Sequence, residues 1–343
     1  MKVTSPKLQK WQRQLPAGEK KLNSINLFSI YNKVGVIACL FLFLYTSSVA
    51  GDDEWKFDAT TQKVYELLLN LQVDQVHHLI PQPQTAQEHY VTALAEALEL
   101  LITGDGEKFT EYEDRFEQRL ERKTKLNTPD DIFLQAEIRM QWAFIYFKFG
   151  HEFDAALNLR QAYLTTAEIK KRFPTFQAIN KTSALLEVII GSVPEKYDWI
   201  LGLLSIQGSL EAGLKELETI RASGHPLSLE ATMLYALVQG YVLQETDKGI
   251  NVMNTIITRN PANRLALFLG ASLAIKNSQS EAALELLNRL GQQQTGLPIY
   301  FADYLKGEVY LHKAEYLNSI TSFRWFINHY RGQNNIKDAH YKI

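Results

Sequence analysis

The sequence contains very little cysteine: the single one, Cys39, lies inside an apolar run at residues 34–50. A body that begins after this run has no cysteine, which excludes disulfide bonds, thiolate metal sites and cysteine nucleophiles from it. Long hydrophobic runs are also lacking. The strongly apolar part of residues 34–50 is about a dozen residues, whereas a membrane-spanning helix needs about 20.

Motifs of catalysis and of phosphate binding are missing as well. The chain has no HExxH, no GxSxG and no glycine-rich phosphate loop. Adjacent His77 and His78 would point about 100° apart on a helix, so they are poorly placed to chelate one metal ion and are expected to pack at the surface or in a turn. Acids and bases alternate at helical spacing in residues 107–125, as on a solvated helix. We therefore predict no catalytic residue, no metal site, no cofactor and no enzymatic activity.

Charge is divided unevenly along the chain. The first 50 residues hold seven Lys or Arg and one acid, so 29 of the 36 basic residues and 37 of the 38 acidic residues follow them. The body is thus mildly acidic and offers no basic stripe for phosphate contacts. This composition predicts that nucleic acid is not a partner.

The basic first segment, the apolar run and the acidic residues that follow form the pattern of a secretory signal. Ser48 and Ala50 occupy the small-residue positions of a cleavage site before Gly51. We predict that residues 1–50 are a signal peptide or an N-terminal membrane anchor, and that the body is exported to the periplasm or cell envelope. A buried core helix is the alternative for residues 34–50, and it accounts less well for the basic flank.

The body is predicted to be helical throughout. Apolar residues recur at helical spacing between short breakers, and Thr128 with Pro129 has the pattern of a helix start. Prolines open four helical segments at intervals of 32, 35 and 37 residues: Pro194, Pro226, Pro261 and Pro298. A period near 34 residues predicts an all-α fold, namely an α–α superhelix of stacked antiparallel helix pairs.

Residues 141–167 show how such a pair would pack. Small residues twelve apart let two helices approach, and larger apolar residues fill the seam. The expected positions are Ala143, Tyr146, Gly150 in the turn, Ala155, Leu159 and Ala162. The same offsets fit Gly307, Tyr310, Ser319, Phe323 and Phe326, and also Gly270, Ala282 and Leu286. In this interpretation Trp142 lies in a helix seam, and His151 is a solvent-side turn residue and not part of an active site.

These offsets resemble those of the tetratricopeptide-repeat superfamily over residues 128–343, and by pattern alone over residues 55–127. We expect residues 51–127 to form an N-terminal helical region before the repeats. Two segments further resemble the inclusion-body clearance protein family, as an exported bacterial relative would. The matching positions are Pro194, Trp199, Leu203, Leu204 and Gly208, then Tyr330, Gly332, Asn335, Lys337, Asp338 and Ala339. The last helix has no expected partner and runs to Ile343, which predicts that repeats continue past the C-terminal end.

The resemblance implies a non-enzymatic scaffold that binds a protein or peptide partner in the concave groove of the superhelix. Groove positions carried over from it are Arg264, Phe301, Tyr304, Glu308, Leu311 and His312. Ordinary packing between repeats is the alternative for each of them. Two other functions stay open: the helical platform of a larger envelope hydrolase that cleaves peptidoglycan, and a glycan-binding helical-repeat protein. The latter would need a lipidated cysteine and exposed tryptophans, whereas Trp142 and Trp199 are expected in seams.

Overall fold

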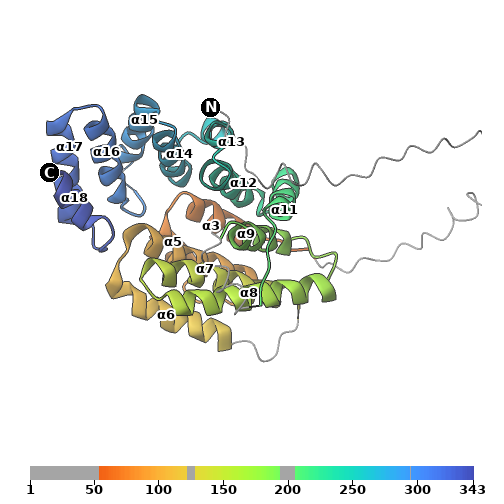
Figure 1. The fold of residues 1–343 in the computed structure, drawn as a ribbon. Helices are drawn as coiled ribbons and strands as arrows, with labels where there is room; N and C mark the ends of the chain where they lie inside the picture. Colours follow the sequence, from red (N-terminus) through yellow and green to blue (C-terminus); the bar gives the residue numbers. More distant parts are fainter. Residues whose placement is uncertain (1–53, 122–127, 194–204, 294) are drawn as a thin grey trace, which may run out of the picture. The chain divides into compact units, whose positions relative to one another are not determined.

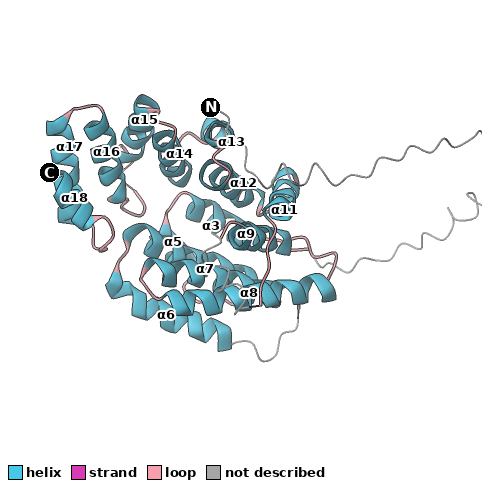
Figure 2. Cartoon of the chain, in the orientation of Figure 1, coloured by secondary structure: helices cyan, strands magenta, loops and turns pink. Residues whose placement is uncertain are grey.

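The computed structural model describes residues 54–121, 128–193, 205–293 and 295–343. Every regular element in these ranges is a helix, and they contain no strand (Figure 2). The predicted all-α class is therefore confirmed. The signal-like run at residues 34–50, as well as Pro194 and Trp199, lie outside the described residues.

The helices follow one another along the chain (Figure 1). They are α3 (Ala59–Leu69), α4 (Val73–Leu79), α5 (Ala86–Thr103), α6 (Gly106–Glu121), α7 (Pro129–Lys148), α8 (Glu152–Arg172), α9 (Ile179–Gly191), α11 (Leu210–Ala222), α12 (Ser228–Leu237), the π-helical turn η4 (Val238–Val242), α13 (Thr246–Arg259), α14 (Arg264–Lys276), α15 (Ser280–Gly291), α16 (Phe301–His312), α17 (Tyr316–His329) and α18 (Ile336–Lys342).

Two kinds of contact define how the helices stack. Helices that follow one another in the described part of the chain pack as pairs: α7 with α8, α9 with α11, α14 with α15, and α16 with α17. Alternate helices also touch, α5 with α7, α7 with α9, α12 with α14, and α14 with α16. These alternate contacts form an inner row of helices, which the remaining members of the pairs cover from outside. This is the predicted α–α superhelix.

Local sequence explains where the helices begin and end. Asp58 caps α3 by accepting a hydrogen bond from the Thr61 amide at 2.7 Å, and Thr85 forms a capping box with Glu88 at the start of α5. Thr128 caps α7 with a proline in its first turn, as predicted. Each side-chain cap satisfies a backbone amide that the helix itself leaves unpaired.

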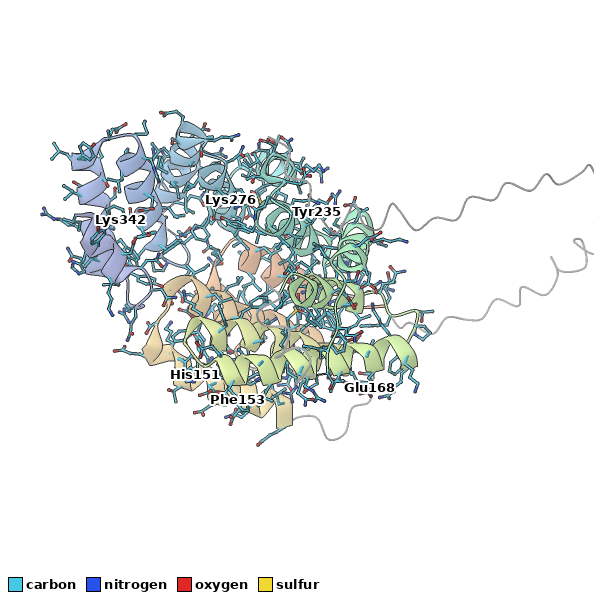
Figure 3. All side chains as sticks on the ribbon, viewed as in Figure 1. His151, Phe153, Glu168, Tyr235, Lys276 and Lys342 are labelled. Carbon is cyan, nitrogen blue, oxygen red and sulfur yellow. The ribbon has the colours of Figure 1, made fainter. Side chains whose placement is uncertain are left out.

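The seam between α7 and α8 is as predicted. Ala143, Ala155 and Ala162 are buried, and Gly150 makes the turn at a φ of +81°. His151 precedes the first residue of α8 and is half exposed, beside the exposed Phe153 (Figure 3). Its ring stacks on Phe109 with 5.4 Å between the ring centroids. The histidine is a turn residue.

The seam between α16 and α17 also follows the prediction. The Ser319 hydroxyl donates a hydrogen bond to the Gly307 carbonyl, twelve residues earlier, at 2.9 Å. The Phe323 ring fills the space over the glycine, since a Cβ there would lie 2.6 Å from it. The absence of a side chain at Gly307 therefore allows the close approach of these two helices.

The prediction for α14 and α15 is wrong by one residue. Ala282 is exposed, and Ala283 is fully buried together with Leu284 and Leu287. Ala271, twelve residues before Ala283, is buried on α14. The physical reason is that α14 is buried on nearly all sides, so a small residue does not mark one particular face of it. Gly270 gives room to Ile257 of α13, which an added Cβ would meet at 2.9 Å, and also to the predicted Leu286 of α15, which it would meet at 3.3 Å.

The last helix has a partner, contrary to expectation. Ala339 of α18 is fully buried in an apolar cluster with Tyr304, Phe323, Phe326 and Tyr330. This cluster packs α18 against the pair α16 and α17.

The region before α16 also packs on the N-terminal helices. The Leu297 amide donates to the Leu71 carbonyl at 2.8 Å, and the Gln72 amide nitrogen lies 3.2 Å from the Thr295 hydroxyl. The largest apolar cluster correspondingly runs from Trp55 to Ala302. The cluster includes residues on both sides of position 128. A boundary there between an N-terminal helical region and the repeats stays a prediction.

The seam between α9 and α11 yields a stability prediction. A Cβ on Gly213 would lie 2.6 Å from the Ala184 carbonyl oxygen and 2.9 Å from the Val188 amide nitrogen. Gly213→Ala is expected to lower the free energy of unfolding by about 2 kcal/mol, because the overpacked atoms are backbone and outweigh the better helix propensity of alanine. Urea denaturation measures this. Gly106→Ala is the control, since nothing lies within 4 Å of its Cβ, and an equal loss there would contradict the explanation.

Candidate functional site

A cavity of about 420 Å³ lies among the inner helices, with lining residues from α3, α5, α7, α9, α12, η4 and α14. We call it the central cavity. Most of its wall is aliphatic or aromatic, as represented by Leu98, Leu101, Phe144, Ile189, Leu234 and Leu269. Its volume falls in the range of ligand-binding pockets, about 300–1,000 Å³. The π-helical turn η4 contributes Val238, Tyr241 and Val242 to the wall, and such turns occur frequently at functional sites.

Gln141 is an unusual polar residue in this apolar wall. It lies four residues after Glu137 on α7, so both face the same side of the helix. Its side chain is 6% exposed, and neither the amide nitrogen nor the amide oxygen has a hydrogen-bond partner within the described part of the chain. Leaving a buried polar group unpaired costs about 1–3 kcal/mol. Both functions of the amide are thus left unsatisfied by the described residues.

Two carboxylates at the edge of the central cavity belong to a buried charged cluster. Lys181 on α9 is 0% exposed, and its ammonium donates to Glu137 at 2.7 Å, to Glu230 at 2.6 Å and to the Tyr90 hydroxyl at 2.9 Å. We call the group the Lys181 cluster. Its members are Tyr65, Tyr90, Glu137, Lys181, Thr182 and Glu230.

Every carboxylate oxygen of the Lys181 cluster accepts a hydrogen bond. The Tyr65 and Tyr90 hydroxyls both donate to one oxygen of Glu230, at 3.0 and 2.6 Å, and Lys181 takes the other. Lys181 donates to one oxygen of Glu137, and the Thr182 hydroxyl donates to the other. The donors and acceptors come from α3, α5, α7, α9 and α12. The cluster therefore joins α3 and four helices of the inner row at one point.

Burial and charge shift the pKa values of the cluster in opposite ways. Burial raises the pKa of Glu137, and the neighbouring Glu230 adds to the rise while Lys181 opposes it. Burial alone would lower the pKa of Lys181, but the two carboxylates outweigh it and raise that pKa. Burial, reinforced by Glu230, raises the pKa of both tyrosines far above the usual value. The tyrosines consequently stay protonated donors, and the lysine stays a cation.

The groove positions predicted from the resemblance do not line the central cavity. Tyr304 donates from its hydroxyl to Asp338 at 2.5 Å, and Glu308 accepts from Lys342 at 2.7 Å. Phe301 stacks on Tyr304 with 5.1 Å between centroids. These contacts bring Phe301, Tyr304 and Glu308 together on α16, where α18 packs against them. Lys342, on α18, is labelled in Figure 3.

The remaining predicted positions lie apart from this group. His312 is exposed at the end of α16, and Leu311 is half buried. Arg264 is 4% exposed and donates to the Leu297 carbonyl at 2.7 Å. Its Nε and Nη1 atoms have no hydrogen-bond partner within the described ranges, and burial lowers its pKa. Arg264 thus fixes the segment before α16 and does not face the central cavity.

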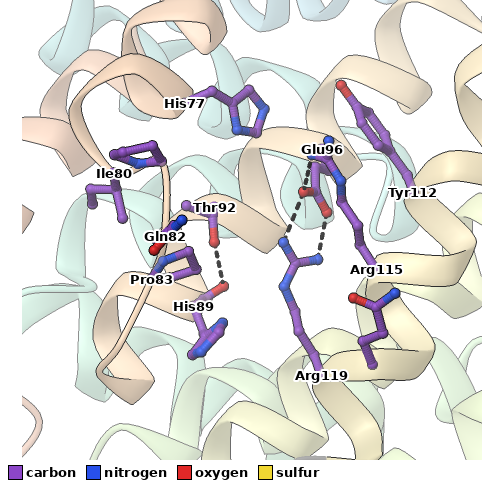
Figure 4. A pocket seen from close by; sticks show the side chains of 12 residues that line it. His77, Ile80, Gln82, Pro83, His89, Thr92, Glu96, Tyr112, Arg115 and Arg119 are labelled. Carbon is purple, nitrogen blue, oxygen red and sulfur yellow. Dashed lines mark hydrogen bonds and ion pairs between the residues drawn. The ribbon is translucent and has the colours of Figure 1, made fainter.

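A second cavity, of about 650 Å³, lies between α4, the loop after it, α5 and α6 (Figure 4). We call it the polar pocket. Arg119 donates to both oxygens of the buried Glu96, at 2.5 and 2.8 Å, and Arg115 donates to Glu96 at 3.1 Å. His77 lies in its wall, whereas His78 is exposed.

Among the described residues no three His, Cys, Asp or Glu side chains are grouped so that they could hold a metal ion. None of the helices in the described part is long and apolar enough to span a bilayer. Compared with known proteins, the chain matches no family model, no curated protein and no solved structure.

Sequence reasoning missed the Lys181 cluster and Gln141. Lys181 is the single charged residue in the first turns of α9, a helix that is otherwise largely apolar. A lone charge in an apolar helix was the available signal, because a buried charge requires a partner. The sequence could not reveal that its partners stand 44, 49 and 91 residues away.

The Lys181 cluster predicts a pH-dependent loss of stability. Lys181→Met leaves buried carboxylates without their cation and is expected to cost about 3–5 kcal/mol of unfolding free energy at pH 7. The pKa of Glu137 is already above its usual 4.5 in the folded chain, and losing the cation raises it further. A carboxyl whose pKa is higher in the folded chain than in the unfolded chain stabilises the fold fully when the pH is below its unfolded pKa. This stabilisation is lost as the pH rises through the folded pKa.

The deficit of Lys181→Met should therefore shrink as pH falls from 7 towards 5. Urea denaturation of both proteins at several pH values measures it. Lys248→Met removes an exposed pair with Glu245 and should change stability by less than about 0.5 kcal/mol. A deficit for Lys181→Met that is independent of pH would refute the charge explanation.

Proposed function

We propose that the chain is a non-enzymatic scaffold of the cell envelope that binds a protein partner by taking an apolar segment of it into the central cavity. The observation that carries the proposal is the unpaired amide of Gln141 in an apolar wall. The inner row of a helical superhelix is the face on which such proteins hold peptide segments. We further propose that the helix pairs are tetratricopeptide-like, with a relationship to the inclusion-body clearance family.

The chemistry of the cavity favours a peptide over other ligands. A primary amide presents one acceptor and two donor hydrogens, which complement the N–H and C=O of a peptide bond. The apolar wall suits large aliphatic or aromatic side chains. Phe144 and Tyr241 remain partly exposed while lining the cavity, and aromatic residues of this kind anchor protein interfaces. An apolar side chain next to an accessible main-chain amide satisfies both requirements.

Charge narrows the choice of partner. The Lys181 cluster contains two carboxylates and one ammonium, and Glu137 and Glu230 both line the central cavity. This excess of negative charge disfavours an acidic segment in the cavity. The partner segment is therefore apolar with neutral or basic flanks.

Export remains a proposal that is supported by the pattern of residues 1–50. A basic arm, an apolar run and a small-residue cleavage site precede the acidic body. If the segment is retained and not cleaved, it attaches the scaffold to the membrane through residues 34–50.

Site-specific crosslinking in cells that express the full chain tests the proposed function. The photoreactive residue p-benzoylphenylalanine replaces Phe144, which is 38% exposed and lines the cavity, or Phe153, which is 73% exposed and does not. We expect a defined protein to be captured from position 144 and not from position 153, with the attachment mapped to an apolar segment. Equal capture from both positions, or none from position 144, would count against the central cavity as the binding site.

Gln141→Leu separates binding from stability. The substitution keeps the approximate volume and removes a buried polar group that has no partner, so the unfolding free energy should stay equal or rise. Affinity for the captured segment should fall at least tenfold, equivalent to about 1.4 kcal/mol. Titration calorimetry with that segment measures the change. Gln161→Leu, on an exposed position of α8, is the matched control and should bind as the wild type does.

A further inference from the structure

The polar pocket is separate from the central cavity, although both use α5. Leu94, Ala97 and Leu98 of α5 line the central cavity, whereas Thr92 and Glu96 line the polar pocket, and the two cavities share no lining residue. The polar pocket plays no part in the proposed function. Its ligand has to be inferred from its own chemistry.

Two guanidinium groups meet at one buried carboxylate in this pocket. Glu96 accepts two hydrogen bonds from Arg119 and a third from Arg115, as described above. Figure 4 shows Arg115 and Arg119 reaching from α6 towards Glu96 on α5. Glu96 and Arg119 are both buried, so this pair is a fixed part of the wall. The cations at the pocket exceed the buried anions by one.

Arg115 is the cation that a ligand can reach. Its side chain is 41% exposed, and its second bond goes to Glu111, whose side chain is 59% exposed. An exposed ion pair between neighbouring turns of a helix contributes little to stability, because solvent screens it. A ligand anion can therefore replace Glu111 at little cost while the bond from Arg115 to Glu96 holds the guanidinium in place.

His77 supplies a second polar atom whose hydrogen-bonding capacity is unsatisfied. Its Nε2 atom is buried without a hydrogen-bond partner among the described residues, and the ring lies on the α4 side of the pocket (Figure 4). Burial lowers the pKa of the imidazole, which keeps it neutral at neutral pH. A neutral imidazole nitrogen forms a hydrogen bond without adding charge. Beside it, Ile80, Pro81 and Pro83 give the pocket an apolar edge.

We propose that the polar pocket binds one carboxylate ligand. The carboxylate takes the place of Glu111 on Arg115, and a neighbouring polar group of the ligand forms a hydrogen bond with the Nε2 atom of His77. A guanidinium matches the geometry of a carboxylate with two parallel hydrogen bonds. The ligand has a small apolar part that packs on the proline edge.

A singly charged anion fits better than a phosphate. Glu96 and Glu99 are both buried beside the site, and Glu99 already accepts bonds from the Tyr112 hydroxyl and Lys108. One carboxylate balances the one cation in excess. A phosphate group carries between one and a half and two negative charges at neutral pH, and it would leave uncompensated negative charge near two buried carboxylates.

The carboxylate can come from the C-terminus of a peptide or from a small organic acid, and the experiment separates these sources. The full chain is titrated with N-acetyl-alanyl-alanine, with its C-terminal amide, with propionate and with inorganic phosphate, while the histidine ring resonances are followed by NMR. Binding of the free-acid peptide but not of the amide, with weaker binding of propionate, identifies a peptide C-terminus. Equal binding of the two acids identifies a small organic acid.

Paired variants place the binding in the pocket. Arg115→Gln removes the reachable cation and leaves Arg119 to hold Glu96, and it should weaken carboxylate binding at least tenfold. His77→Phe keeps a ring without Nε2 and should weaken it about threefold to tenfold, while His78→Phe, at the exposed neighbour, should have no effect. Circular dichroism confirms that each variant is folded. Gln141→Leu should bind these acids normally, because the central cavity is a different site.

Several results would overturn the proposal. They are the absence of binding by both acids at millimolar concentration, tighter binding of phosphate than of either acid, and equal binding of the peptide amide and the free acid. Unchanged affinity in Arg115→Gln would do the same, because the anion would then lie elsewhere.

Discussion

The ion cluster around Lys181 is the interaction on which the inner row of helices depends. A fully buried ammonium is stable only where anions and hydrogen-bond acceptors surround it, and here they come from α5, α7 and α12. Each of these helices must keep its register for the cluster to be complete. Apolar seams alone would allow the helices to slide along one another. The cluster fixes the register of the helices at one point, and it fixes the wall of the central cavity as well.

The two cavities illustrate two uses of buried polarity on one helix, α5. At the central cavity the charged groups of the Lys181 cluster pair with one another, and the remaining wall is mostly apolar except for Gln141. Towards the polar pocket Glu96 holds two guanidinium groups, and one of them retains an exchangeable partner. The proposed protein-binding face and the proposed anion site can therefore both use α5, because the charges are fully paired with one another at the first site and one cation has an exchangeable partner at the second.

The predicted groove positions lie on a different surface from the wall of the central cavity. Phe301, Tyr304 and Glu308 share one face of α16, as the repeat pattern requires. In this chain α18 supplies Asp338 and Lys342 to that face, and the inner helices before it enclose the cavity. The error at Ala282 has a related cause. Small residues mark a seam only where one face of a helix is buried, and α14 is buried nearly all round.

The sequence by itself determined the helical class, the helix start at Thr128, the turn at Gly150 and the seams through Ala155 and Ser319. Periodicity, capping and small-residue spacing act over fewer than about 15 residues, so one chain segment contains all the information they need. Only the tertiary structure decided the partners of Lys181, the open amide of Gln141, the covering of Tyr304 and the pairing of Arg115 with Glu96. Each of these depends on residues brought together from distant helices, and whether a polar group is paired or open depends on the geometry of all its neighbours at once.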